Sequence, residues 1–259
     1  MSALRPRTNP PDSSPARGAH ARGKVGAMVD RASLRLSATL LLAGQLLFIV
    51  VTHFHTGGPA NNHPEVFAGY AGSQAWTAVH IGQFAAMAIL LAGLLALFSA
   101  LNARAGAARW ASRFGAASAV AALALYAILQ AVDGVALKHA VDAWAGAPDA
   151  EKPARFASAE AIRWLEWGMR SYQDFALGLA LLLLAAAVVR AKGIPRPIAY
   201  LMGLSGLTYL AQGWVAGSEG FTSTQTILIV LAFVLDLAWM IWLVAVAWRM
   251  QDPDVQFTE

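Results

Sequence analysis

Long apolar runs alternate with short polar segments along this chain of 259 residues. Each run is close to the roughly 20 residues that an α-helix needs to cross the hydrocarbon core of a bilayer. We therefore predict an all-α fold, a polytopic membrane helical bundle that occupies residues 34–249. Its six predicted transmembrane helices are Leu34–Val51, Gln74–Leu101, Trp110–Ala136, Tyr172–Val189, Pro195–Val215 and Thr226–Arg249.

A further helix is predicted between the third and fourth spans, from Asp149 to Tyr172. Apolar side chains recur there at steps of three and four residues, the period of one helix face. Trp164 and Trp167 add side chains that favour the membrane interface. The segment therefore reads as an amphipathic helix on the outer membrane surface, either capping a cavity or resting on lipid.

Composition and charge placement support a membrane protein. Hydrophobic residues make up 58% of the chain and charged residues 13%, whereas soluble domains have about a quarter charged residues. Fourteen of the 19 Lys and Arg residues lie in the N-terminal tail, the second and fourth connections and the C-terminus. The positive-inside rule then predicts cytoplasmic termini in a bacterial inner membrane. Anionic inner-leaflet lipid is the expected partner of these charges, and nucleic acid is not.

The two ends of the chain are predicted to be tails. Residues 1–33 are rich in Arg, Pro, Ser, Gly and Ala without apolar periodicity, which indicates a disordered basic cytoplasmic tail. Residues 250–259 read as a short acidic cytoplasmic tail. The absence of cysteine excludes disulfides and thiolate metal sites. The oligomeric state leaves no signal in the sequence.

Four of the six histidines lie between Thr52 and Phe84. In an extended segment, His53 and His55 point the same way and can reach one metal ion. A turn at residues 57–59 then brings His63 back toward them. With a carboxylate, imidazoles suit zinc, copper or iron. The predicted metal ligands are His53, His55, His63 and His80, and the alternative is that the loop histidines are simply solvated.

Polar side chains gather in the outer half of the predicted bundle. His80 and Gln83 share one face of the second span, and Gln130 and Asp133 share one face of the third. Polar groups are costly against hydrocarbon, so we expect an outward-opening polar cavity. Gln83, Gln130 and Gln212 are its predicted substrate-binding residues. The alternative is that each Gln forms an ordinary interhelical hydrogen bond.

Asp236 is the deepest charge, in the sixth predicted span, with no Lys or Arg at its depth. Carboxylates inside a membrane commonly handle protons or bind ligands. Asp133 and Asp236 are therefore the candidate catalytic residues. A protonated Asp236 that only packs between helices is the alternative.

The H-x-H loop and the segments WTAVHIGQF and AIRWLEWG resemble uncharacterised bacterial multi-pass membrane proteins of unknown function. The resemblance covers most of residues 34–249 and implies no activity. Three hypotheses stay open: a metal-dependent enzyme acting on a lipid-like substrate, a transporter or sensor for a cation or small polar solute, and a structural membrane protein without an active site. A divalent metal is the predicted cofactor under the first.

Overall fold

The computed structural model describes residues 29–58, 61–101 and 106–250, which are helical apart from short connections. The predicted all-α class is confirmed. Residues 1–28 and 251–259, which hold most of both predicted tails, lie outside the described residues. The helices are α1 (Arg31–His53), α2 (His63–Gly72), α3 (Trp76–Leu101), α4 (Gly106–Ala131), the π-helix η1 (Val132–Leu137), α5 (Lys138–Ala145), α6 (Lys152–Val188), α7 (Arg196–Glu219) and α8 (Ser223–Arg249).

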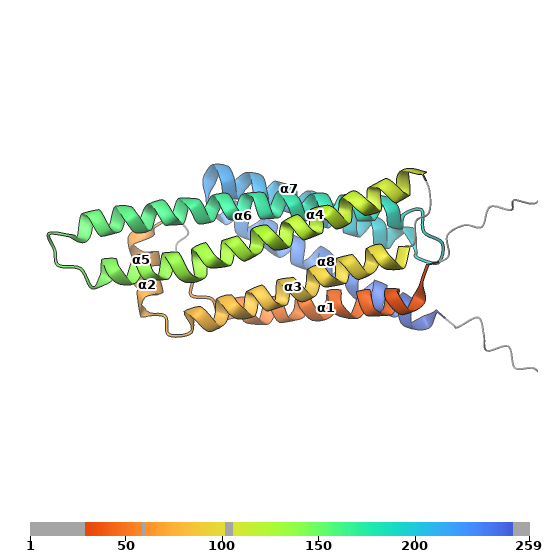
Figure 1. Ribbon diagram of the computed structural model, residues 1–259, viewed down its shortest axis with the longest axis horizontal. Coiled ribbons are helices and arrows are strands. Elements are labelled where there is room, and N and C mark those ends of the chain that lie inside the picture. Colours follow the sequence, from red (N-terminus) through yellow and green to blue (C-terminus); the bar gives the residue numbers. More distant parts are fainter. Residues whose placement is uncertain (1–28, 59–60, 102–105, 251–259) are drawn as a thin grey trace, which may run out of the picture.

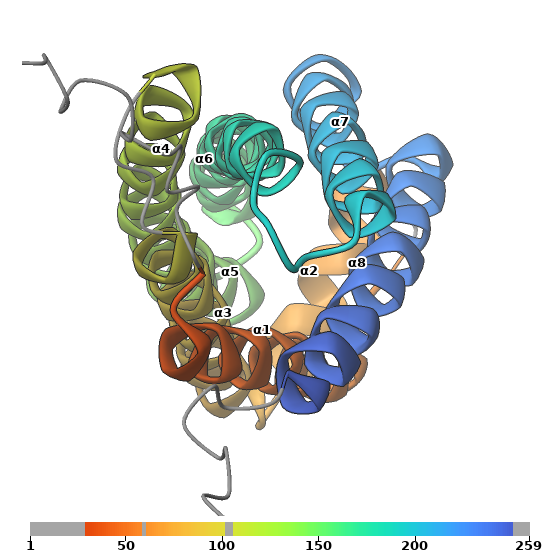
Figure 2. The same cartoon turned by 90° about the vertical axis from the view of Figure 1, so that its right-hand side faces the viewer.

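Six long helices run along one axis, and the short helices α2 and α5 lie at one end (Figure 1). Viewed along the axis, the long helices form a ring in the order α1, α3, α4, α6, α7 and α8, and α8 packs back on α1 (Figure 2). At the end opposite α2, the start of α1 meets the ends of α3 and α8. The Asp30 amide donates to the Ala100 carbonyl at 2.9 Å, and Arg35 Nε donates to the Ala247 carbonyl at 3.2 Å.

Five helices of the described part are long and apolar enough to cross a membrane. They are α1, α3, the continuous helix formed by α4, η1 and α5, then α6 and α8. Many large apolar side chains remain exposed on their outer faces, as lipid-facing residues do; Leu36, Ile81 and Ile227 are examples. This supports the predicted multi-pass bundle in a lipid bilayer. The sixth span, α7, is not among the five and stays a prediction.

The predicted interfacial helix is not a separate element. It forms the first part of α6, a single helix of 37 residues that continues into the fourth predicted span. Its apolar face is partly inside, since Ala159 is buried and Phe156 and Ile162 pack against the same small core, whereas Leu165 is 49% exposed. Arg163 and Glu166 of the charged face are buried as well. Periodicity identifies the apolar face but does not show that charged residues beside it are also buried. Here the buried charges are tolerated because they pair with one another.

The third predicted span also continues beyond its expected end at Ala136. The helix runs without a break from Gly106 to Ala145, and the π-helix η1 lies toward its C-terminal end, before the eight residues of α5. A π-turn holds an additional residue per hydrogen-bonded ring and shifts the side chains that follow, often at functional sites. In η1, Asp133 and Gly134 are buried against α3.

Glycines allow α6 and α7 to pack with their backbones in contact. A Cβ atom added to Gly178 would lie 2.7 Å from the Gly206 carbonyl oxygen, and one added to Gly206 would lie 2.8 Å from the Gly178 carbonyl oxygen. Such reciprocal small residues permit close helix approach in membranes, where van der Waals packing drives association.

We expect Gly206→Ala to lower the melting temperature of the detergent-solubilised protein. The added methyl group has no space, and overpacking costs about 1–3 kcal/mol. Gly203→Ala in the same helix is the matched control, because its nearest neighbour would be the Ala185 Cβ at 3.8 Å, an ordinary contact. Equal melting temperatures for the two variants would show that the α6–α7 contact is looser than described.

Candidate functional site

His80 and Asp133 face each other between α3 and η1. The Nδ1 atom of His80 lies 2.7 Å from the Trp76 carbonyl oxygen, one helical turn earlier, and Nε2 lies 3.1 Å from Asp133 Oδ2. A carbonyl oxygen can only accept, so Nδ1 carries the hydrogen. In the neutral imidazole, Nε2 then presents a lone pair to a carboxylate oxygen. The pair therefore requires either a proton between the two groups, carried by His80 or by Asp133, or a cation bound by both side chains.

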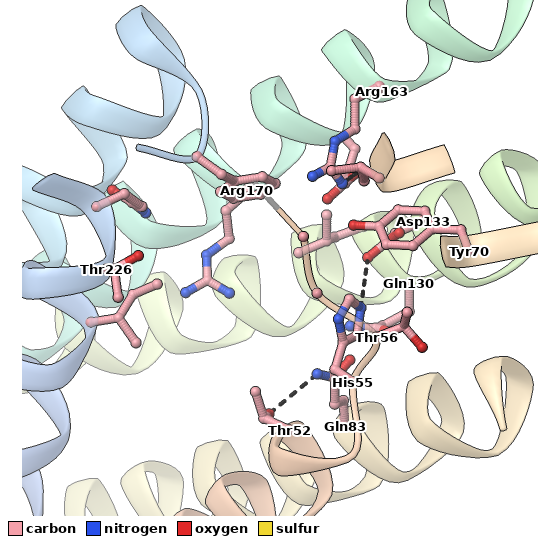
Figure 3. A pocket seen from close by; sticks show the side chains of 18 of the residues that line it. Thr52, His55, Thr56, Tyr70, Gln83, Gln130, Asp133, Arg163, Arg170 and Thr226 are labelled. Atoms are coloured by element: carbon pink, nitrogen blue, oxygen red, sulfur yellow. Dashed lines mark hydrogen bonds and ion pairs between the residues drawn. The ribbon is translucent and has the colours of Figure 1, made fainter. Parts of the chain in front are cut away.

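His55 completes a group of three possible metal ligands. It follows the end of α1, and its Nε2 lies 4.0 Å from Asp133 Oδ2 (Figure 3). Each of the three side chains offers one ligand atom, and these atoms all lie within 4.8 Å of one another. Burial lowers the pKa of His55, although the negative charge of Asp133 alone would raise it. Burial thus favours the neutral imidazole, which is the form that binds metals.

Neighbouring residues hold these three side chains in place. The Trp76 indole N–H donates to the Asp133 backbone carbonyl at 3.3 Å, so one residue orients both His80 and Asp133. Gly134 is required next to His80, because a Cβ atom there would lie 2.8 Å from the His80 Cβ. The Tyr70 and Trp76 rings contact the His55 ring, with centroids 6.1 and 5.2 Å away.

A cavity of about 290 Å³ lies inside the ring of helices, and His55 and Asp133 form part of its wall. Figure 3 shows His55, Asp133 and Gln130 on one side of this cavity and Thr226 on the other, with Arg170 between them. Part of the lining is apolar and comes from α1, α4 and α8, through Phe48, Leu129, Ile229 and Phe233. The cavity is therefore amphipathic.

Two ion pairs on α6 border the cavity. Arg163 donates to Glu166, each residue is 3% exposed, and the Arg163 guanidinium also stacks 4.8 Å from the Phe221 ring centroid. Arg170 Nε donates to Asp174 at 3.0 Å. Sequence reasoning placed Arg163, Glu166 and Arg170 in the interfacial helix and Asp174 at the start of the fourth span, and it missed their role in the site. Their spacing of three, four and four residues, which puts them on one helix face, was the available signal.

The structure brings together five of the predicted site residues. His55, His80 and Asp133 form the cluster, and Gln83 and Gln130 lie beside it in the cavity wall. Gln83 Nε2 donates to Thr52 Oγ1 at 3.2 Å (Figure 3). Four of the five, all except His55, come from helices on which sequence reasoning placed them at a common depth.

The remaining predicted site residues lie elsewhere. α1 extends through His53, so the expected extended H-x-H segment is wrong and His53 is exposed on the outside of the helix. His63 Nδ1 lies 2.9 Å from Glu160, which ties α2 to α6. Gln212 donates to the Leu228 carbonyl at 3.3 Å, an interhelical hydrogen bond. Neither His53 nor His63 joins the cluster.

Asp236 is buried between α7 and α8 and does not line the cavity. It accepts hydrogen bonds from the Tyr209 hydroxyl at 2.9 Å and from the Trp239 indole N–H at 3.1 Å. Both carboxylate oxygens therefore have donors within the helix pair. This arrangement fits the packing alternative better than a ligand-binding role.

Comparison with known proteins yields a family but no described activity. No curated protein and no solved structure matches the chain. The model of one family, described as a domain of unknown function (DUF4386), matches residues 84–247, a region that includes Asp133 and the charged face of α6 and begins after His55 and His80. This match covers more than half of the sequence, so the chain belongs to the DUF4386 family, an uncharacterised family as the resemblance led us to expect.

Proposed function

We propose that this chain is an integral membrane protein with a metal centre formed by His55, His80 and Asp133. The observation that carries the proposal is the approach of His80 Nε2 to Asp133 Oδ2 while Nδ1 is committed to a carbonyl. Two imidazoles and one carboxylate are a ligand set for catalytic zinc or for iron(II). Bonds of 2.0–2.2 Å at tetrahedral angles separate ligand atoms by roughly 3.3 Å. The distances of 3.1 and 4.0 Å bracket that value.

A metal held by these three side chains would keep a coordination position for water. A metal lowers the pKa of bound water toward neutrality and so supplies a nucleophile. Glu166, the other carboxylate in the cavity wall, accepts a hydrogen bond from Arg163 through Oε2; under this proposal its Oε1 would take the proton of that water and return it to a leaving oxygen. The corresponding reaction is hydrolysis: the water oxygen bonds to an electrophilic carbon or phosphorus as the ester bond to the leaving oxygen breaks.

Apolar surfaces near the cluster support a lipid-like substrate. Besides the apolar part of the cavity, a groove of about 270 Å³ lies between α3 and the α4–η1 helix and reaches His80 and Gln130. Its other lining is mostly apolar, including the exposed side chains of Ile81, Phe84 and Val135. Both surfaces would accommodate hydrocarbon. A transport function centred on Asp236 has less support, since its two donors already satisfy that carboxylate.

The proposal includes an orientation. α7 has 24 residues and runs beside α6 and α8, so we count it as the sixth span. The cavity lies toward α2 and α5, whereas the start of α1 and the end of α8 lie at the other end (Figure 1). Combined with the distribution of Lys and Arg, this gives cytoplasmic termini, basic segments against anionic inner-leaflet lipid, and a cavity on the extracytoplasmic side of the inner membrane.

Elemental analysis of the purified full-length protein tests the metal centre. We expect about one equivalent of zinc or iron, since one three-ligand site holds one ion. His55→Ala and Asp133→Asn should each retain less than about a tenth of it, because removing one of three ligands leaves too few donors. His53→Ala is the matched control: this residue lies two positions from His55 but is exposed outside the cluster.

Each variant is also checked for its melting temperature, so that loss of metal is not confused with loss of fold. Equal metal content in wild type, His53→Ala and His55→Ala would refute the assignment. A protein that binds no metal, and whose variants differ only in stability, would favour the structural alternative.

A further inference from the structure

The cavity wall formed by α8 contains a buried amide without a partner among the described residues. Gln225, at the start of α8, is 1% exposed and lines the cavity. Within the described residues, neither its Nε2 nor its Oε1 forms a hydrogen bond. Buried polar side chains are nearly always hydrogen-bonded, so an unpaired amide in a cavity wall indicates a missing ligand.

Arg170 supplies a cation to the same space. Its guanidinium points into the cavity from α6 (Figure 3). Nε is held by Asp174, which does not line the cavity, so the positive end of this ion pair faces the open space. The two terminal nitrogens donate no hydrogen bond to any residue that the structure describes. A guanidinium fork of this kind matches the oxygens of phosphate or carboxylate.

We propose that Arg170 and Gln225 form a binding site for a phosphate group. They line the same cavity from different helices, α6 and α8, which suits the divergent oxygens of a tetrahedral anion. The cavity carboxylates, Asp133 and Glu166, are engaged by His80 and Arg163 and do not oppose the anion unpaired.

The apolar residues Phe48, Ile229 and Phe233 line the same cavity and can contact a hydrocarbon substituent of the phosphate. The ligand chemistry is therefore a phosphate carried either by a lipid headgroup or by free phosphate. If the metal cluster hydrolyses this ligand, a phosphate ester is the substrate class. This part of the inference rests on the proposed function. The ester would lie between Arg170 and the metal cluster.

Isothermal titration of the full-length protein with three soluble ligands tests this site. The ligands are dihexanoyl phosphatidic acid, dihexanoylglycerol, which lacks the phosphate, and inorganic phosphate. We expect phosphatidic acid to bind at least about tenfold more tightly than dihexanoylglycerol, because hydrogen bonds to a charged group contribute that much. Gln225→Leu should reduce this preference severalfold, and Arg170→Lys should as well, since lysine keeps the charge but loses the fork.

Gln225→Leu breaks no hydrogen bond of the described structure, so it should fold normally. Arg190→Met is the control, because Arg190 is away from the cavity and donates to the Ala186 carbonyl. Inorganic phosphate binding as tightly as phosphatidic acid would assign the site to free phosphate; weaker binding assigns it to a lipid phosphate. No preference in wild type, or an unchanged preference in both cavity variants, overturns the site. Repeating the titration with His55→Ala separates the two proposals, since phosphate binding that persists there stands without the metal centre.

Discussion

Arg163→Met is expected to destabilise the protein by about 3–5 kcal/mol, the usual effect of removing one partner from a buried ion pair. Glu166 would remain 3% exposed without its guanidinium partner. The substitution also removes the stacking of Arg163 on the Tyr70 and Phe221 rings, at 5.5 and 4.8 Å. Thermal and denaturant unfolding in detergent, followed by tryptophan fluorescence, measure the change.

Two further variants test whether the unpaired charge of Glu166 causes the loss of stability. Arg163→Met/Glu166→Gln should recover much of the lost stability, because the double variant leaves no uncompensated charge. Arg155→Met removes a pair with Glu151, the residue that precedes α6, in which both side chains are 54% exposed. Exposed pairs contribute about 0–1 kcal/mol, so this control should be nearly neutral. Equal effects of Arg163→Met and Arg155→Met, or no recovery in the double variant, would contradict a buried structural pair.

The helices and their membrane character could be predicted from the sequence because hydrophobic length is a direct signal. The second predicted span, Gln74–Leu101, differs from α3 by two residues at its start. The common depth of His80, Gln83, Gln130 and Asp133 was also predictable, because it depends only on counting residues along adjacent helices. The cavity that Gln83, Gln130 and Asp133 share follows from that depth.

The details that complete the site depend on features without a periodic signal. The sequence pattern does not show where α1 ends. A few hydrogen bonds decide it, such as that from the His55 amide to the Thr52 carbonyl. The π-turn of η1 leaves the apolar pattern intact, yet it determines where Asp133 points. The burial of Arg163 and Glu166 on α6 depends on their pairing with one another, and amphipathicity alone does not supply that information.

Gly134→Ala is expected to weaken metal binding by roughly 10–100-fold, the range typical of changes that displace a ligand through its neighbours. The new methyl carbon would lie 2.8 Å from the His80 Cβ, and both atoms are fixed to helix backbones. η1 and α3 must therefore separate, which moves His80 Nε2 away from Asp133 Oδ2. Competition against a chromophoric chelator, with protein stripped of metal beforehand, measures the affinity.

Gly146→Ala, at the end of the same continuous helix, is the matched control, because its nearest new neighbour would be the Asp142 carbonyl oxygen at 3.5 Å. It should bind metal as the wild type does. Since alanine favours helix over glycine by about 1 kcal/mol, neither substitution should unfold the helix. A loss of affinity confined to Gly134→Ala ties metal binding to the close approach of η1 and α3. Unchanged affinity in Gly134→Ala would mean that His80 and Asp133 do not share an ion, and that their contact is a proton-mediated pair.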